Sequence, residues 1–446
     1  MGDVVASAGP LSEAQPDQGA WRPTTILPIS HLARISAYWL GLTAIDGAVG
    51  GAIQSRVDFE HLVPKLEQGG ALREIGIIAL IIGIVIQPTV GSISDYTISR
   101  WGRREPYILA GSLLDVVILL AISQSHTVIA LAAFVALLSI STNVARGPFQ
   151  GYVPDLVPNE QVGLASAMVG LMQILGNVVG FALVAIANIA GNVGIALLGV
   201  AVVELITMLS VVIRVDNGPP AKPRSGRSWW SIAAETWGTD ILQQRSYVFL
   251  VASRLFVLAG GATLVNFVVF FLSDSFSQTQ SEVGGTQLEI LAVIVVANCL
   301  AIVPAARLSD RIGRKPVIYV SCLLGGAGLL VAGVAPSIPI ALVGAGLFGL
   351  SAGMFLAVDW ALMTDIIPRA SAGRYMGLSN VATGASTIVA LIIGSIALDY
   401  FNTRYGIGVG ARAAYLIGAA GFLIGALLLH PVVEPPRRSR ADAALP

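Results

Sequence analysis

The apolar residues of this chain are gathered into twelve long runs, which short polar stretches separate. Most of these runs reach the roughly 20 residues that an α-helix needs to cross a bilayer. Because the runs are continuous rather than alternating, they predict helices and argue against strands. The expected spans are residues 33–55, 72–96, 106–124, 127–151, 161–189, 192–214, 247–272, 286–308, 316–335, 338–364, 373–399 and 410–430.

The polar stretches contain phrases that occur once in each half of the chain. Residues 155–158 (Asp-Leu-Val-Pro) match residues 365–368 (Asp-Ile-Ile-Pro) at an offset of 210 residues. A second phrase consists of Gly91, Asp95 and the basic run at residues 100–104. Its counterpart is the stretch at residues 310–315, which also joins an aspartate to a basic run. Such a long-period repeat indicates two copies of one multi-helix unit, which is typical of membrane carriers.

We therefore expect an all-α membrane protein whose twelve transmembrane helices form two pseudo-symmetric six-helix bundles, at residues 31–214 and 247–430. Residues 1–30 are polar and lack the apolar core of a cleavable signal peptide, so we expect a disordered cytosolic tail. Residues 215–246 combine prolines and basic residues with tryptophans, which favours a cytosolic linker with an interfacial piece. Residues 431–446 form a second cytosolic tail.

The charged residues are few, and their distribution sets the expected orientation. Only 12% of the chain is charged, against about 25% in soluble proteins, which excludes an ordinary soluble protein. Nineteen lysines and arginines fall in the tails, the linker and the loops on the side of the termini, and five fall in the opposite loops. By the positive-inside rule, both termini are cytoplasmic, in a multi-pass protein of the inner or plasma membrane.

Other function classes lack their residues in this sequence. The two cysteines lie in apolar runs and the four histidines are scattered, so neither a disulfide framework nor a metal site is expected. There is no phosphate-binding loop and no Ser/His/Asp constellation, which argues against an enzyme and against ATP as the energy source. We expect no cofactor, no metal and no nucleic acid. The expected partners of this monomer are a small-molecule solute, protons and the lipid bilayer.

The repeated loops place acidic, glycine and basic residues at matching positions. A carboxylate at one helix end can accept hydrogen bonds from the start of the next helix and can pair with nearby arginines. Such a cluster can hold one side of a carrier shut and then release it. A simpler interpretation is that the arginines only follow the positive-inside rule, but the repetition in both halves favours the lock. The expected gating residues are Gly91, Asp95, Arg103, Arg104, Asp155, Asp310, Arg311, Gly313, Arg314 and Asp365.

Among the ionisable residues inside the expected spans, five stand out as functional candidates. A charge at the centre of a membrane helix costs at least about 2.5–3.5 kcal/mol, so each such residue is a functional candidate. The five are Asp46, Asp115, Arg146, Glu204 and Asp359.

The repeated loop phrases resemble the loop motif of the major facilitator superfamily, and the resemblance covers residues 30 to 430. The four extra residues 96–99 and the sequence Arg146-Gly147-Pro148 are similar to the branch of sucrose:proton and related glycoside:cation symporters. The chain departs from this branch at one position. Plant sucrose carriers have a basic residue shortly after the Gly-Pro, where this chain has Gln150. Drug antiporters carry a Gly-Pro in the fifth helix and sugar uniporters a Pro-Glu-Ser-Pro-Arg phrase after the sixth. This chain has neither.

The resemblance implies that helices one, four, seven and ten line a central cavity. Three of the five ionisable residues fall on that set, and Asn266 adds a hydrogen-bonding group on helix seven. Asp46 is the expected proton site and Arg146 its switch partner, although a static ion pair between them is an open alternative. The expected solute- and proton-binding residues are Asp46, Arg146, Asn266, Asp359, Trp39 and Trp360.

Helices three and six are peripheral in that fold, which favours a structural role for Asp115 and Glu204. The tryptophans would stack on a sugar ring or anchor the helices at the membrane interface. We expect a secondary active transporter that moves a sugar or glycoside with protons by alternating access. An exporter of small hydrophobic compounds on the same fold is one alternative, and a non-transporting receptor or lipid-handling protein is another.

Overall fold

The computed structural model describes residues 25–213, 244–366 and 372–434. The described residues are almost entirely helical and contain no strand. Most of the expected tails and linker lie outside these ranges.

Two groups of six long helices follow each other along the chain. The first group consists of α1 (Ile29–Phe59), α2 (Gln68–Ser94), α3 (Glu105–Ser123), α4 (Val128–Phe149), α6 (Val162–Ile189) and α7 (Gly194–Val212). The second consists of α9 (Arg245–Phe276), α10 (Gln280–Ile312), α11 (Arg314–Val334), α12 (Ile338–Ile366), α13 (Ala372–Tyr405) and α14 (Val409–Leu429). Short elements are η1 (Lys65–Glu67), α5 (Tyr152–Leu156) and η2 (Asn159–Gln161).

Each expected span coincides with one long helix, which confirms the all-α fold. Several helices extend past the apolar run that predicted them, because polar residues form their first turns. At the start of α10, for example, the Thr279 side chain and Glu282 form a capping box, which begins the helix at Gln280. Within the described residues, eleven helices are long and apolar enough to cross a membrane. The remaining long helix is α1, which has 31 residues but carries many polar ones.

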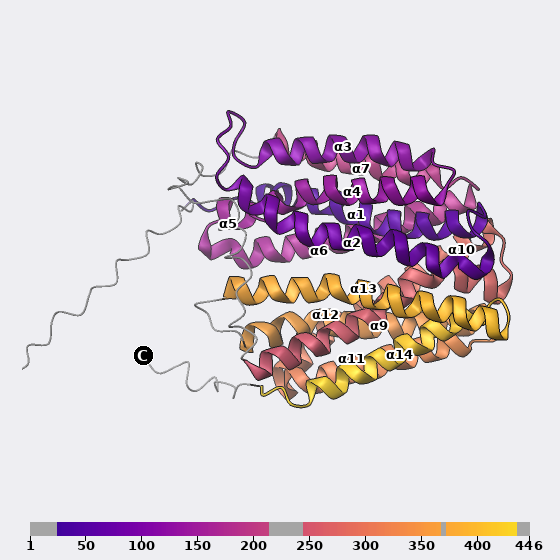
Figure 1. Ribbon diagram of the computed structural model, residues 1–446. Helices are drawn as coiled ribbons and strands as arrows, with labels where there is room; N and C mark the ends of the chain where they lie inside the picture. Colours follow the sequence, from indigo (N-terminus) through magenta and orange to yellow (C-terminus); the bar gives the residue numbers. More distant parts are fainter. Residues whose placement is uncertain (1–24, 214–243, 367–371, 435–446) are drawn as a thin grey trace, which may run out of the picture.

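The two groups form two bundles that lie side by side (Figure 1). They meet along three helix pairs: α1 with α9, α2 with α13, and α6 with α10. We call the end of the molecule where α1 begins and α14 ends the terminal end, and the opposite end the distal end. The loops between α2 and α3 and between α10 and α11 are at the terminal end, on the left in Figure 1.

Within each bundle, glycines let helix backbones touch. A Cβ atom at Gly176 would lie 2.3 Å from the carbonyl oxygen of Leu40, and one at Gly180 would lie 2.4 Å from that of Ala44. The α1–α6 seam therefore has no room for a side chain on the α6 side at these two positions. Gly353 on α12 has the same relation to the carbonyl oxygen of Asn298 on α10, at 2.4 Å. The sequence pattern of small residues thus produces the close packing that membrane helices use.

Candidate functional site

An ion pair joins α1 to α4 in the first bundle. Arg146 Nη2 lies 2.9 Å from Asp46 Oδ1 and 2.7 Å from Oδ2. The same nitrogen donates to the carbonyl oxygen of Leu42 at 3.1 Å. The Asp46 side chain is 47% exposed and that of Arg146 is 17% exposed, so the carboxylate faces open space while the guanidinium is held behind it. The two residues therefore make the contact that either a switch or a static pair requires.

A second ion pair joins α9 to α12 in the other bundle. Arg254 donates to Asp359, and both side chains are buried. The guanidinium carbon of Arg254 also lies 4.9 Å from the ring centre of Trp360, which is a cation–π contact. The signs are exchanged between the bundles: the acid is on α1 and the base on α4, whereas the base is on α9 and the acid on α12. Arg254, whose role sequence analysis missed, is the partner of Asp359.

The other expected binding residues lie in different surroundings. Asn266 on α9 is partly buried, and its amide nitrogen has no hydrogen-bond partner among the described residues. Its buried amide nitrogen is therefore an unused hydrogen-bond donor in the middle of α9. The Trp39 ring packs 5.6 Å from the ring of Phe149, so the structure places it in an aromatic cluster between α1 and α4. Trp360 is 40% exposed beside Arg254.

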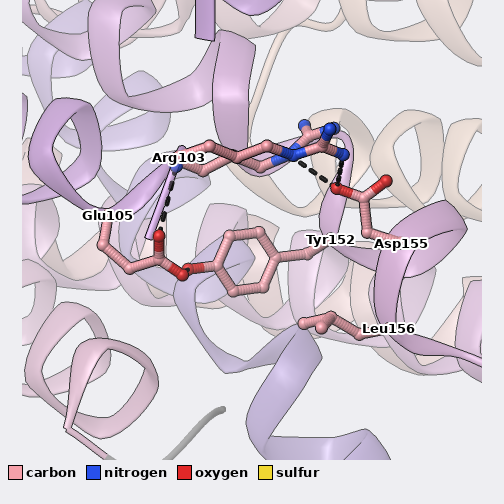
Figure 2. Close-up of a pocket in the computed structure, with 6 residues that line it drawn as sticks. Arg103, Glu105, Tyr152, Asp155 and Leu156 are labelled. Carbon is pink, nitrogen blue, oxygen red and sulfur yellow. Dashed lines mark hydrogen bonds and ion pairs between the residues drawn. The ribbon is translucent and has the colours of Figure 1, made fainter. Parts of the chain in front are cut away.

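A charged cluster lies at the terminal end of the first bundle. Arg104 lies 3.0 Å from Asp95 and 2.8 Å from Asp155, and Arg103 pairs with Asp155 as well. Figure 2 shows the Asp155 carboxylate facing the arginine side chains, and the Tyr152 hydroxyl directed at Glu105. That hydroxyl donates to Glu105 Oε1 at 3.0 Å.

The Glu105 carboxylate also accepts a hydrogen bond from the backbone N–H of Arg104, at 3.1 Å, and so caps the start of α3. Glu105 and Tyr152 are not among the expected gating residues. They pack beside the arginines and support them, and their only sequence signal is proximity to the repeated phrases.

The second bundle has the corresponding cluster with one central arginine. Arg314 lies 2.7 Å from Asp310 and 3.5 Å from Asp365. Its backbone N–H donates to Glu434 at 2.9 Å, which ties the segment after α14 to the start of α11. Each bundle therefore joins two carboxylates from its repeated phrases through arginine, while the gating role of these clusters stays a prediction.

The remaining expected gating residues are two glycines, which act through the backbone, and Arg311. Gly313 has a φ of +115° between α10 and α11, a conformation that glycine adopts without strain. Gly91 on α2 faces Gly147 on α4, where an added Cβ would meet the Gly147 carbonyl oxygen at 3.2 Å. These two glycines allow a tight turn and a close helix contact. Arg311 lies in the last turn of α10 and is exposed.

The two bundles are joined at the distal end. Lys65 Nζ lies 2.8 Å from Asp274 of the second bundle and also contacts Asp58 of the first. Asn188 on α6 donates to Gln287 on α10 at 2.9 Å. Across the described residues, the hydrogen bonds between the bundles join the distal parts of the helices. Sequence analysis predicts none of these bridging residues.

Asp115 and Glu204 lie together inside the first bundle, where both are fully buried. The helices that carry them, α3 and α7, pack on one another. A structural role for the two residues, which the sequence favours, stays a prediction. Among the described residues, no group of three His, Cys, Asp or Glu side chains is arranged to hold a metal ion.

Comparison with known proteins agrees with this architecture. The sequence model of the Major Facilitator Superfamily matches residues 63–279 and 251–445. A crystal structure of a point mutant of the nucleoside transporter NupG superposes with a TM-score of 0.70, covering 91% of this chain and 100% of that chain at 13% identity. That likeness concerns the fold.

Curated relatives match over shorter stretches. The sucrose transport protein SUT1 of Oryza sativa subsp. japonica is 27% identical over 170 residues, 32% of each chain. The general alpha-glucoside permease of Schizosaccharomyces pombe is 28% identical over 171 residues, which are 34% of this chain and 31% of the permease. The matches thus span about a third of these relatives' own length.

Proposed function

Because the chain belongs to the major facilitator superfamily and is a multi-pass membrane transporter of small solutes, we propose that it carries a sugar or glycoside together with protons. Two considerations support this substrate class. The central helices present hydrogen-bonding and aromatic side chains, and carboxylates, amides and indole rings are the groups that suit sugar hydroxyls and ring faces. The two curated relatives named above are a sucrose transport protein and an alpha-glucoside permease.

The contact between Asp46 and Arg146 carries the proposal. The carboxylate is bound to the guanidinium on one side and open on the other, so a proton can reach it without passing the arginine. A proton on Asp46 removes the charge that holds Arg146, whose side chain then becomes available to solute hydroxyls. Loss of the proton restores the ion pair and competes with the solute. Binding of proton and solute is thereby linked, which is what symport requires.

In this proposal, the Arg254–Asp359 ion pair lines the cavity on the side of the second bundle. Arg254 is held between Asp359 and the Trp360 ring, and the half-exposed indole leaves one face of this group open. We assign Trp360 to stacking on the solute ring and Asn266 to hydrogen bonding with solute hydroxyls. Trp39, packed on Phe149, would support α1 rather than contact the solute.

The gating proposal follows from where the bundles touch. The arginine clusters at the terminal end each lie within one bundle, while the described bridges between bundles lie at the distal end. We propose that the terminal end is cytoplasmic, in the plasma or inner membrane, and that residues 31–214 and 247–430 rock against each other as units of a monomer. The structure then corresponds to the state that is closed toward the outside.

Transport by purified protein in lipid vesicles tests the proposal. A panel of radiolabelled sucrose, maltose, glucose and xylose is offered with an inward pH gradient and, separately, for counterflow without a gradient. Wild type should accumulate at least one sugar against its gradient. Asp46→Asn should lose accumulation and retain counterflow, because the neutral side chain no longer exchanges a proton. Glu160→Gln, which changes an exposed carboxylate, is the matched control and should accumulate normally.

The alternatives give different outcomes. Full accumulation by Asp46→Asn would remove this residue from coupling. Proton-driven efflux of lipophilic cations, with no flux of any sugar, would favour the exporter. Absence of flux for every solute would leave a receptor or lipid-handling protein.

A further inference from the structure

Two carboxyl groups lie buried next to each other between α3 and α7 of the first bundle. Asp115 on α3 and Glu204 on α7 are close enough for their carboxyl groups to interact directly, and both side chains are 0% exposed. Asp115 Oδ1 accepts from Ser141 and, at 3.0 Å, from Thr142. Glu204 Oε1 accepts from the Tyr38 hydroxyl at 3.3 Å. The second oxygen of each, Asp115 Oδ2 and Glu204 Oε2, has no hydrogen-bond donor among the described residues.

The adjacent Asp115 and Glu204 carboxyl groups require one proton between them. Ionised carboxylates only accept hydrogen bonds, so two adjacent buried carboxylates leave both Oδ2 and Oε2 without a donor unless one of the groups carries a hydrogen. Two adjacent carboxylates in an apolar interior repel each other, and such pairs hold one proton in common. The orphaned oxygens Oδ2 and Oε2 lack the donor that one shared proton supplies. The nearby hydroxyls are neutral and cannot cancel a second negative charge.

The titratable groups near the pair come from two helices. On α1 these are Tyr38, whose hydroxyl contacts Glu204, and Asp46, which is linked to the pair only through Arg146. On α4 the charged group is Arg146, which interacts electrostatically with Asp115 and with Tyr38. Between Val162 and Ile189, α6 has no titratable residue, and on α7 Glu204 stands alone. Arg146 Nε is buried and has no hydrogen-bond partner among the described residues, so the guanidinium has a donor to spare. One arginine thus binds the open Asp46 carboxylate and also interacts electrostatically with Asp115 of the buried pair.

We propose that Asp115 and Glu204 form a proton-binding site that holds one shared proton and sets the strength of the Asp46–Arg146 contact. With the proton in place, the pair carries one negative charge and Arg146 stays on Asp46, as observed. When the proton leaves to solvent, the pair carries two negative charges and competes with Asp46 for the guanidinium. Tyr38 and Arg146 are positioning residues for this exchange. The coupling role rests on the proposed proton-linked transport, but the existence of the shared proton does not.

Infrared difference spectroscopy of the full chain in lipid vesicles tests the shared proton directly. Wild type should show the carbonyl band of a protonated carboxyl group at neutral pH, and the band should shift in D₂O. Asp115→Asn and Glu204→Gln should each lose that band, because an amide donates to the remaining carboxylate without a proton. Asp46→Asn and Glu160→Gln should keep it. Absence of the band in wild type, or its persistence in both pair variants, would overturn the proposal.

The wild-type spectrum decides the matter even where a variant fails to fold, since it needs no substitution. A second readout tests coupling, using radiolabelled maltose counterflow as a function of pH. The pH profile of Glu204→Gln should flatten relative to wild type, whereas a purely structural role would lower flux equally at all pH values. Equal scaling at every pH would overturn the coupling role. If neither wild type nor any variant moves maltose, but the carbonyl band is present in wild type and lost in both pair variants, the sugar assignment fails and the proton site stands.

Discussion

Asp399 on α13 caps the first turn of α2 in the opposite bundle: its Oδ1 accepts a hydrogen bond from the backbone N–H of Gly69 at 2.8 Å. A carboxylate at this position satisfies an unpaired helical N–H and interacts favourably with the positive end of the helix. Gly69 is needed for the contact, since an added Cβ would lie 2.6 Å from the same oxygen. A helix cap that crosses between bundles breaks whenever the distal end opens.

Removal of this cap should therefore shift the conformational equilibrium toward a distal-open state. Loss of a helix cap costs about 0.5–2 kcal/mol, so Asp399→Ala should raise the distal-open population by roughly 2- to 30-fold. Spin labels at the exposed residues Glu60 and Thr403, in a background without cysteine, would report the change as a longer distance distribution. Glu67→Gln alters another exposed carboxylate at this end and should leave the distribution unchanged. An identical distribution for Asp399→Ala would contradict a role in closure.

Lys65 holds two carboxylates that would otherwise face each other. Asp58 is 0% exposed and Asp274 is 3% exposed, so neither is stabilised by water when the lysine is removed. Lys65→Met should destabilise the protein by about 3 kcal/mol, the lower end of the range for a broken buried pair, because Lys65 itself is one-third exposed. Thermal unfolding in detergent measures this. Lys65→Met combined with Asp274→Asn should recover part of the loss, and no recovery would mean that the lysine acts by packing alone.

The ion pair of Arg254 with Asp359 should behave as a unit. Either single neutralisation, Arg254→Gln or Asp359→Asn, leaves one buried charge without its partner and should cost about 3–5 kcal/mol. The double variant removes both charges and should be more stable than either single variant. A double-mutant cycle on the unfolding free energies gives the coupling. Strictly additive losses would show that the two residues do not depend on each other.

The Arg104 side chain, which pairs with Asp95 and Asp155, fills the space beside the Gly151 backbone. A Cβ at this position would lie 1.5 Å from Arg104 Nη1, so the guanidinium must leave its place between Asp95 and Asp155. Gly151→Ala should destabilise the first bundle by about 1–3 kcal/mol, as overpacking does. Gly163→Ala is the matched control, because its Cβ would meet no atom within 4 Å. Unfolding curves that coincide for the two variants would argue against a structural role of the arginine here.

The helices and the terminal clusters could be predicted because their signals are local or repeated. Long apolar runs mark each span, and the phrase that contains Asp155 recurs with Asp365 at a fixed offset. The pairing of Asp46 with Arg146 follows from the resemblance, which places α1 and α4 on one cavity. Glycine spacing on α6 also indicates the close seam that Gly176 and Gly180 make with α1.

The distal bridges and the buried carboxyl pair could not be predicted in the same way. Lys65, Asp274 and Asp399 stand in stretches that have no counterpart in the other half, and their partners lie 209 to 330 residues away. Arg254 falls near the start of a span, where a basic residue is ordinary, although its side chain is buried against Asp359. Asp115 and Glu204 stand on separate helices with no sequence signal that joins them. Only the packing of α3 on α7 brings the two carboxyls into contact.

The seam between α1 and α6 has a consequence for engineering. Since neither Gly176 nor Gly180 can accept even a methyl group, a combinatorial library that varies these sites would yield mostly unfolded proteins. Trp360 on α12, which is 40% exposed, offers the tolerance that these α6 positions lack. Redesign of solute stacking can therefore begin at Trp360, with the glycines of the α1–α6 seam left unchanged.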